Sequence, residues 1–294
     1  MITAIGLSTD PTLRHFVAQC RTSGTEVELV DLHDLALADW MFPLPGQDAI
    51  WRDGETERHL PAAGRYYVRP IDLSSVVESR RDSLSWQSMV QALNAWLESI
   101  GEAIVINRPG HFQDNGSKPL HEALLARRGF LVPPSLTSSD AAALSAFARA
   151  PSIVKTISGA CADCWGVTPD DFAAFRPESG PVHLQRRVEG ADVRAHVVGD
   201  SVLALRIDSE ATDYRIDGEA AYAPVTLPDA LTERMTRTAR DMGLIFSGWD
   251  FKVDRDGQYW LLEANPMPGY NSYDKRLDGS ITAALVALLT EVRR

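Results

Sequence analysis

Residues 248–268 read Gly-Trp-Asp-Phe-Lys-Val-Asp-Arg-Asp-Gly-Gln-Tyr-Trp-Leu-Leu-Glu-Ala-Asn-Pro-Met-Pro. Two runs rich in apolar residues flank Asp256-Gly257, a dipeptide typical of a two-residue hairpin turn. With these two residues as the loop, Arg255 faces Gln258 and the strands continue outward from that pair. The stretch therefore predicts an antiparallel β-hairpin.

The same turn predicts that oxygen-bearing side chains converge. Asp250 faces Glu263 across the two strands, and directly opposed residues share one face of a sheet. Asn265 lies two residues beyond Glu263, and the period of two in a strand returns it to that face. Two carboxylates and an amide oxygen suit Mg²⁺ held partly by protein and partly by nucleotide phosphates. The alternative is a surface hairpin with solvated acidic groups, but Trp249 and Phe251 should pack beneath the face and favour a metal site.

The composition is that of an ordinary globular protein. Of the 294 residues 45% are hydrophobic and 23% charged, and the formal net charge is −11. This charge disfavours non-specific nucleic-acid binding, which needs a basic surface. The start, Met1-Ile-Thr-Ala-Ile5, lacks the features of a signal peptide, and no run reaches the length of a membrane span. We therefore expect a cytoplasmic protein without a nucleic-acid or membrane partner.

Cysteine usage fits a reducing compartment, because Cys20, Cys161 and Cys164 cannot all pair within one chain. Cys161-Ala-Asp-Cys164 has the spacing of redox and zinc motifs. No second pair of cysteines or histidines completes four ligands, so a coincidence within a loop is the favoured interpretation.

The first third of the chain alternates apolar runs with helical patterns, which predicts an α/β layer. The Pro- and Gly-punctuated residues 41–64 predict a long connection, with low order around 45–62. Arg108-Pro109-Gly110 predicts a domain boundary. The expected strands are 2–7, 27–32, 66–70 and 103–107, and the expected helices are 11–23 and 83–100.

The rest of the chain mixes helices with mostly extended segments. Antiparallel strands joined by tight turns such as Gly199-Asp200 are the natural interpretation. The expected helices are 118–128, 139–149, 228–242 and 281–292, and the expected strands are 152–155, 183–188, 193–198, 201–207, 249–253 and 259–264.

The hairpin resembles the final motif of the ATP-grasp ligases, an Asp strand followed by a Glu-x-Asn-Pro strand. Within that family the chain resembles ribosomal-protein glutamate ligases and the ligases that crosslink ribosomal peptides. The resemblance covers about residues 105–290. The motifs that carry it are Lys118-Pro-Leu, Val132-Pro-Pro, Ile153-Val-Lys155, Leu184-Gln-Arg-Arg-Val188, Asp192-Val-Arg194 and Asp213-Tyr-Arg215.

The resemblance implies an α/β (α+β) chain with an ATP-grasp fold behind a small N-terminal α/β domain. The N-terminal domain is expected at 1–106 and the ATP-grasp domain at 107–294, divided into a central subdomain, about 107–184, and a C-terminal subdomain, 185–294. The implied cofactors are ATP and Mg²⁺, with one or two ions, for which Mn²⁺ could substitute.

The resemblance also implies how the phosphates are held. Lys118 and Lys155 resemble the two lysines that reach the α- and β-phosphates, where a point positive charge offsets the nucleotide charge. Residues 158–166 resemble the mobile loop that closes over the phosphates, with backbone N–H groups of Ser158 and Gly159 in reach. This loop is less rich in glycine than is usual in the family, which leaves an ordinary connection as the alternative.

Further candidates lie between the lysines and the hairpin. Gln185, Arg186 and Val188 resemble the hinge whose backbone groups bind adenine, and Asp192 resembles the acid that binds the ribose hydroxyls. With Lys155, the arginines Arg194 and Arg206 resemble catalytic positions that stabilise the transferring phosphoryl group or hold a substrate carboxylate, work that suits a bidentate guanidinium. The alternative for each arginine is ordinary surface solvation. Arg215 and Asn271 are candidates on the substrate side.

The implied reaction is the formation of an amide. A carboxylate attacks the γ-phosphate of ATP, which gives an acyl phosphate and ADP, and an amine then displaces phosphate. The alternatives are a maturase that modifies side chains of a peptide or protein, an ATP-grasp kinase that phosphorylates a hydroxyl and stops, and a non-catalytic nucleotide-binding module, which need not keep a complete metal set. The expected partner is a small amino acid or a peptide of specialised metabolism, and a homodimer is the commonest assembly for such an enzyme.

Overall fold

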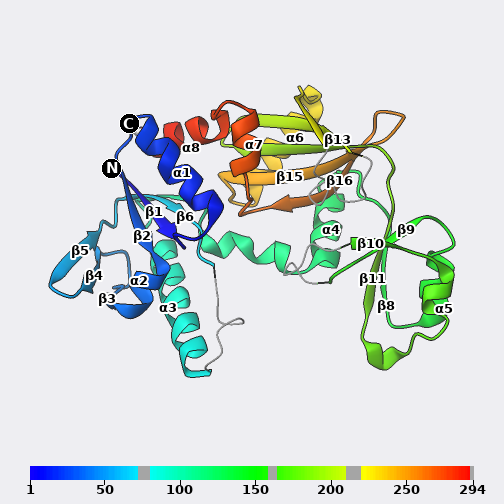
Figure 1. Cartoon of the computed structure of the whole chain (residues 1–294), viewed down its shortest axis with the longest axis horizontal. Helices are drawn as coiled ribbons and strands as arrows, with labels where there is room; N and C mark the ends of the chain where they lie inside the picture. The colour runs from blue at the N-terminus through cyan, green and yellow to red at the C-terminus, as the bar shows by residue number, and fades with distance from the viewer. Residues whose placement is uncertain (72–79, 158–163, 210–219, 292–294) are drawn as a thin grey trace.

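The computed structural model describes residues 1–71, 80–157, 164–209 and 220–291. The chain forms an N-terminal α/β layer, a small antiparallel lobe and a larger five-stranded sheet (Figure 1). This mixed α/β architecture confirms the expected fold class. The domain boundary after residue 106 stays a prediction, and it falls between a strand and the 3₁₀-helix Pro109–Gly116. No helix within the described ranges is long and apolar enough to cross a membrane.

The N-terminal layer is built on a parallel sheet of order β2-β1-β6-β7. Its first helix begins where Asp10 accepts a hydrogen bond from the backbone N–H of Thr12, a typical N-cap, and proline occupies the first turn. The elements are β1 (Ile2–Gly6), α1 (Pro11–Thr22), β2 (Val27–Asp31), α2 (Leu32–Leu37), β6 (Arg65–Val68), α3 (Arg80–Ser99) and β7 (Ile104–Ile106).

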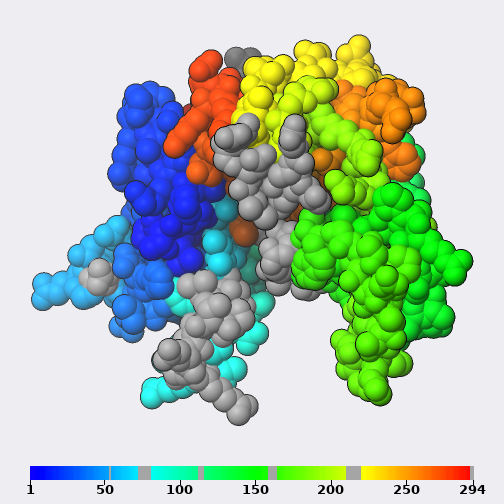
Figure 2. Space-filling view, turned by 45° about the vertical axis from the view of Figure 1, so that its right-hand side comes forward, coloured from blue at the N-terminus to red at the C-terminus, as the bar shows by residue number. Residues whose placement is uncertain are grey.

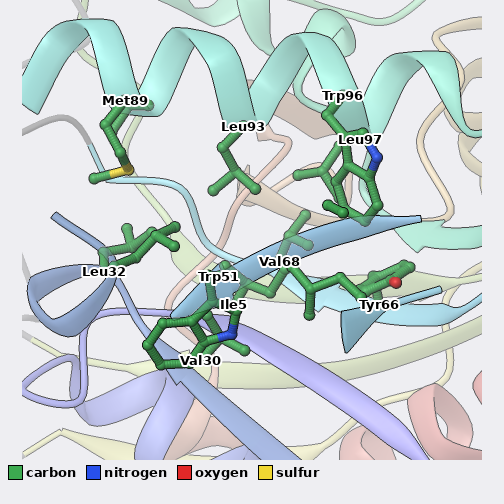
Figure 3. Packing of buried hydrophobic residues seen from close by; sticks show 14 of the residues in the cluster. Ile5, Val30, Leu32, Trp51, Tyr66, Val68, Met89, Leu93, Trp96 and Leu97 are labelled. Carbon is green, nitrogen blue, oxygen red and sulfur yellow. The ribbon is translucent and has the colours of Figure 1, made fainter. Parts of the chain in front are cut away.

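Helices cover both faces of this sheet. Figure 3 shows Met89, Leu93 and Trp96 of α3 packing onto Ile5 and Val68 of the strands. The opposite face packs against α1 and α8 (Ser280–Thr290). Strands buried on both sides explain the nearly continuous apolar runs that the sequence shows here.

The expected low order around 45–62 is wrong. This stretch forms two strands of a three-stranded antiparallel sheet, in which Asp53 faces Thr56 across a two-residue turn and Gly54 has a φ of +58°. Trp51 and Leu60 are buried against the α3 side of the layer, which anchors the sheet. The strands are β3 (Asp39–Met41), β4 (Ala49–Asp53) and β5 (Thr56–Leu60).

The small lobe is an antiparallel sheet of order β10-β9-β11-β8 covered by one helix. Its own apolar cluster centres on Leu144, Phe172 and Leu184. Figure 2 shows this lobe in green, on the other side of the molecule from the blue N-terminal part. The elements are α4 (Lys118–Arg127), which leads into the lobe, β8 (Ser135–Ser138), α5 (Ala141–Phe147), β9 (Ser152–Lys155), β10 (Cys164–Val167) and β11 (Val182–Arg186).

The large sheet is antiparallel, of order β14-β13-β12-β15-β16. The turn predicted at Gly199-Asp200 is confirmed, because Val198 faces Ser201. One face packs against α4 and α6, and the other joins the apolar cluster of α1, α7 and α8. The elements are β12 (Ala191–Val198), β13 (Ser201–Asp208), β14 (Ala221–Pro224), α6 (Asp229–Asp241), β15 (Phe246–Val253), β16 (Tyr259–Asn265) and α7 (Asn271–Arg276).

Candidate active site

The turn of the hairpin differs from the predicted one. Strand β15 ends at Val253, which faces Tyr259, and the backbone N–H of Asp254 donates to the carbonyl of Gln258 at 3.1 Å. Three residues, 255–257, therefore form the loop, with Gly257 in the left-handed region at φ +75°. The predicted pairing of Arg255 with Gln258 is wrong.

A β-bulge restores the predicted pairing of the acidic residues. On the turn side of the irregularity Phe251 faces Leu261, whereas on the far side Asp250 faces Glu263, so β16 carries one extra residue, Leu262. The longer turn shifts the pairing of the two strands by one residue, and the bulge at Leu262 shifts it back before Asp250 and Glu263. Asp250 and Glu263 share a face, as the sequence predicts.

Three neighbouring strands place charged groups side by side on that face. Arg194 of β12 faces Asp250 of β15, which faces Glu263 of β16. The guanidinium of Arg194 donates to Asp250 Oδ2 at 2.6 Å, and both side chains are largely buried. We call this side of β12, β15 and β16 the metal face. Removing two charges from water costs free energy that offsets their attraction, so this buried ion pair adds little to stability. Its position indicates a functional site instead.

Asn265 completes the predicted oxygen set. It faces Gly248 and lies two residues beyond Glu263, and its Oδ1 accepts a hydrogen bond from the backbone N–H of Met267 at 2.8 Å. A carbonyl oxygen has a second lone pair for a metal. No group of three His, Cys, Asp or Glu side chains within the described ranges could hold a metal ion by itself. Two carboxylates and one amide instead fit Mg²⁺ that takes its remaining ligands from phosphate and water.

Lys155 of the small lobe lies in a buried polar cluster with Glu122 of α4. Its side chain is 14% exposed, and its Nζ lies 4.0 Å from Glu122 Oε1. The same oxygen accepts hydrogen bonds from His183 Nε2 at 3.1 Å and Gln185 Nε2 at 2.7 Å. The cluster holds Lys155 and Gln185, both predicted site residues, in fixed positions.

The charges of this cluster connect the small lobe to the metal face. Burial lowers the pKa of Lys155, while the carboxylates of Glu122 and Glu263 oppose that shift and Lys118 adds to it. Burial opposes ionisation of Glu122, but hydrogen bonds from His183 and Ser135 and the charge of Lys155 outweigh it and lower its pKa. Both predicted lysines and one predicted metal ligand therefore act on one another across the two sheets.

Other predicted nucleotide contacts are placed less uniformly. Lys118 opens α4 and its backbone N–H donates to the carbonyl of Ile157 at 2.9 Å. Ser158 and Gly159 lie outside the described residues. The later part of the predicted loop is not a loop, because residues 164–167 form β10, in which Cys164 faces Lys155.

The hinge residues differ in which atoms they can offer. The Gln185 side chain is fully buried, and its Oε1 has no hydrogen-bond partner among the described atoms. The Arg186 guanidinium turns away to the carbonyls of Phe147 and Ala150 and stacks on the Phe147 ring at 3.8 Å. Arg186 is therefore left with its backbone as a possible adenine contact, which is how the resemblance describes the hinge.

Asp192 lies on the metal face but already has a cationic partner. Its carboxylate accepts from Lys252 Nζ at 2.8 Å, and both side chains are largely buried. Asp192 faces Lys252 across β12 and β15. This pair lies two residues along each strand from Arg194 and Asp250. A hydroxyl group that binds Asp192 would share the carboxylate with this lysine.

The structure does not bring Arg206 to the metal face, which contradicts its predicted place beside Arg194. Val193 faces Arg206 on one side and Phe251 on the other, so these residues share the opposite face. The guanidinium is 47% exposed and pairs with Asp208 at 2.8 Å. Neighbouring residues in a strand point to opposite sides, and this geometry removes Arg206 from the candidate set.

The two substrate-side candidates have different outcomes. Arg215 lies outside the described residues. Asn271 opens α7, six residues beyond Asn265, and its Oδ1 accepts from the hydroxyl of Thr12 in α1 at 3.3 Å. Asn271 therefore lies where the N-terminal layer meets the large sheet.

The sequence reasoning missed several residues that hold the site together. Glu122 follows Lys118 by four residues and so lies on the same side of α4, which is a signal that was open to use. Lys252 follows Asp250 by two and shares its face. His196 lies fully buried two residues beyond Arg194, and its Nε2 lies 3.4 Å from Arg194 Nε. Burial and the neighbouring guanidinium lower the pKa of His196 well below its ordinary value, so it is neutral and can accept from Arg194.

Known structures share this arrangement over the full chain. The ATP-grasp ligase PsnB, solved with a minimal precursor, matches with a TM-score of 0.81 and 26% identity over 99% of both chains. This chain belongs to the ATP-grasp superfamily. The macrocyclase MdnC of Microcystis aeruginosa, bound to the precursor peptide MdnA, has the same fold at 18% identity, with a TM-score of 0.81 over 98% of this chain and 99% of MdnC. No family model matches the chain.

Curated ATP-grasp relatives match a shorter region. A probable alpha-L-glutamate ligase of Xanthomonas axonopodis pv. citri is 37% identical over 112 residues, 36% of this chain and 37% of its own length. A D-alanine–D-alanine ligase of Alkalilimnicola ehrlichii is 29% identical over 121 residues, 36% of this chain and 39% of its own length. The chain thus spans a little over a third of the length of these relatives, which are themselves ligases.

Proposed function

We propose that this ATP-grasp protein uses ATP and Mg²⁺ to join a carboxylate to an amine on a peptide substrate. The observation that supports this most is the register that puts Asp250 opposite Glu263 on the metal face. The charge of Glu263 also acts on the pKa of Lys155, which links the small lobe to that face. The two parts together offer a cation for phosphate and a hard oxygen set for a metal.

Mg²⁺ would be held by Asp250, Glu263 and Asn265 and, when bound, would offset charge on the phosphates of ATP. Asp250 can serve as a ligand while it keeps its Arg194 contact, because a carboxylate has two oxygens, each with more than one lone pair. The donor chemistry of the three side chains therefore fits the ion.

The chain's own part in the reaction is positioning and charge. Lys155 and Lys118 would neutralise phosphate oxygens, and Glu122 would keep Lys155 in place. Arg194, held between His196 and Asp250, would face the transferring group or the substrate carboxylate. The substrate carboxylate is ionised at neutral pH and needs no side chain of the protein as a nucleophile. Amide formation then follows when an amine displaces phosphate from the acyl phosphate.

A peptide is favoured as the substrate by the structural relatives. PsnB has been solved with the precursor peptide PsnA2 and AMPPNP, and in another complex with precursor, Mg and ADP. PsnB matches this chain at 26% identity over nearly its whole length. A free amino acid is the second candidate, since the shorter matches are to ligases named for D-alanine and alpha-L-glutamate.

The test is ADP release from ATP with Mg²⁺ across pools of peptides and amino acids, with Glu263→Gln as the matched control. Glutamine keeps the shape of the side chain and removes the charge. We expect ADP only with a particular substrate pool, none from the control, and a peptide product that has lost one water by mass spectrometry. A product that has instead gained a phosphate would make the protein a kinase. Equal ADP release by the control would overturn the metal assignment.

A further inference from the structure

We propose that Asn107 and Arg69, both from the N-terminal layer, are positioning residues for the metal site. They follow β7 and β6, which are neighbouring parallel strands, so they lie at the same edge of the sheet. Both are buried, at 3% and 7% exposure. Their hydrogen bonds go to the two ends of the metal-bearing hairpin, and we call the pair the N-terminal clamp. This inference rests on the proposed function of that hairpin.

Asn107 links the start of β15 to the end of β16. Its Oδ1 accepts from the backbone N–H groups of Ile245 at 2.8 Å and Phe246 at 2.9 Å. Its Nδ2 donates to the carbonyls of Phe246 and, at 2.7 Å, Pro266. All the strong hydrogen-bonding capacity of one amide is therefore spent on joining two strands.

The chain needs this link because the sheet cannot continue there by itself. The last facing pair of β15 and β16 is Gly248 with Asn265. Pro266 follows directly and has no N–H to donate to the neighbouring strand. The Asn107 amide takes over the bonding that the backbone cannot make, at the point where Asn265 must present its side chain to a metal.

Arg69 holds the segment after Asn265. Its guanidinium donates to the carbonyl of Pro268 at 2.9 Å and, at 3.4 Å, to that of Met267, while Asp10 at the start of α1 binds the other side of it. Pro268 in turn packs over Gly248, where an added Cβ would lie 2.7 Å from the proline Cβ and 2.3 Å from the Arg194 guanidinium. Arg69 thus holds residues 267–268 in contact with β15, the strand that carries Asp250.

The consequence is that the N-terminal layer helps to set the affinity of the site for Mg²⁺. Residues that orient the ligands of a metal commonly change metal affinity or activity about 10–100-fold when mutated. A merely structural pair would lower thermal stability without changing how much Mg²⁺ strengthens nucleotide binding. The two roles are therefore separable by measurement.

The experiment compares ADP binding with and without Mg²⁺ by calorimetry, using Asn107→Asp and Arg69→Lys in the full chain. Aspartate keeps the acceptor oxygen and loses the two donors, while lysine keeps a charge for Asp10 but cannot span both partners. We expect the Mg²⁺-dependent gain in ADP affinity to fall about tenfold in each variant, with metal-free binding within about twofold of wild type. Unchanged gains in both folded variants would overturn the clamp.

Arg108→Lys is the matched control. Arg108 is the next residue in the chain, and it donates to backbone carbonyls of Ile100 at 2.9 Å and Ala103 at 3.2 Å, away from the hairpin. It should lower the melting temperature and leave the Mg²⁺ gain unchanged. Glu263→Gln separates the two levels of the argument. If only Glu263→Gln loses the Mg²⁺-dependent gain in ADP affinity, the clamp is wrong and the metal site stands. If Glu263→Gln keeps that gain, the proposed metal site itself is wrong.

Discussion

The two faces of the large sheet use the same strands for opposite purposes. On the metal face, Arg194 and Asp250 are buried polar groups that pair with each other. On the opposite face, their neighbours Trp249 and Phe251 are buried in an apolar cluster with α4 and α6. Alternation along a strand puts each kind of residue on its own side. The metal face thus combines buried charges with apolar residues such as Leu205 and Phe246, whereas the opposite face is apolar along these strands.

The largest effect on activity is expected from a change on the metal face. Glu263→Gln should lower turnover at least ~10³-fold, because a metal ligand that offsets transition-state charge is worth several kcal/mol. Its melting temperature should stay within a few degrees of wild type, since Glu263 is only half-buried. Steady-state kinetics beside a thermal melt would test this, and a large drop in melting temperature would show that the face also carries the fold.

A change on the opposite face should have the reverse effect. Phe251→Ala removes a ring that is 1% exposed and should lower the free energy of unfolding by about 3–5 kcal/mol. Urea denaturation would measure the loss. At a temperature where the variant is folded, the Mg²⁺-dependent gain in ADP affinity should match wild type, and a lost gain would mean that the two faces are not independent.

The buried His196 beside Arg194 should make the stability of the protein depend on pH. His196 has a pKa well below 6.5 when folded and takes up a proton on unfolding, so stability falls as pH drops below about 6.5. His196→Phe should flatten that decline by up to ~1.4 kcal/mol per pH unit. Denaturant midpoints between pH 7 and pH 5 would show it. Parallel profiles for the two proteins would assign the decline to other groups.

The smallest effect is expected at Arg206. Because its side chain lies on the opposite face and pairs with exposed Asp208, Arg206→Ala should change turnover by less than about twofold and stability by less than about 1 kcal/mol. Steady-state kinetics would detect any larger change. A loss near that of Glu263→Gln would mean that the side chain reaches the metal face during turnover.

The sequence predicts that Asp250 faces Glu263, but it does not predict the detailed geometry of the hairpin. Asp250 does face Glu263, but the turn is longer than predicted and a bulge at Leu262 compensates for it. No residue pattern in the sequence predicts either feature. Bulges depend on packing on both faces, which is decided only in the folded chain. The agreement therefore came from two deviations that cancel.

Other differences were readable in principle. The Gly199-Asp200 turn, correctly predicted, places Leu205 opposite Arg194 and so puts Arg206 on the other side. That consequence needs only the period of two. The strands within 45–62 were hidden for a different reason, because their turn residues outweighed the short alternation around Trp51. The partners of Lys155 could not be predicted, since Glu122 and His183 come from separate elements.

The apolar clusters determine which parts of the molecule should unfold together. Phe16 and Tyr67 of the N-terminal layer share one cluster with Leu205 and Phe246 of the large sheet. Leu144 and Leu184 of the small lobe belong to a separate, smaller one. Cooperative units follow such contacts, so the first and last parts of the chain should open together, while the small lobe can open alone at lower free energy. A nucleotide bound at the proposed site would then leave when the lobe that carries Lys155 opens, and a cut at the predicted boundary after residue 106 would divide the apolar cluster that the first and last parts of the chain share.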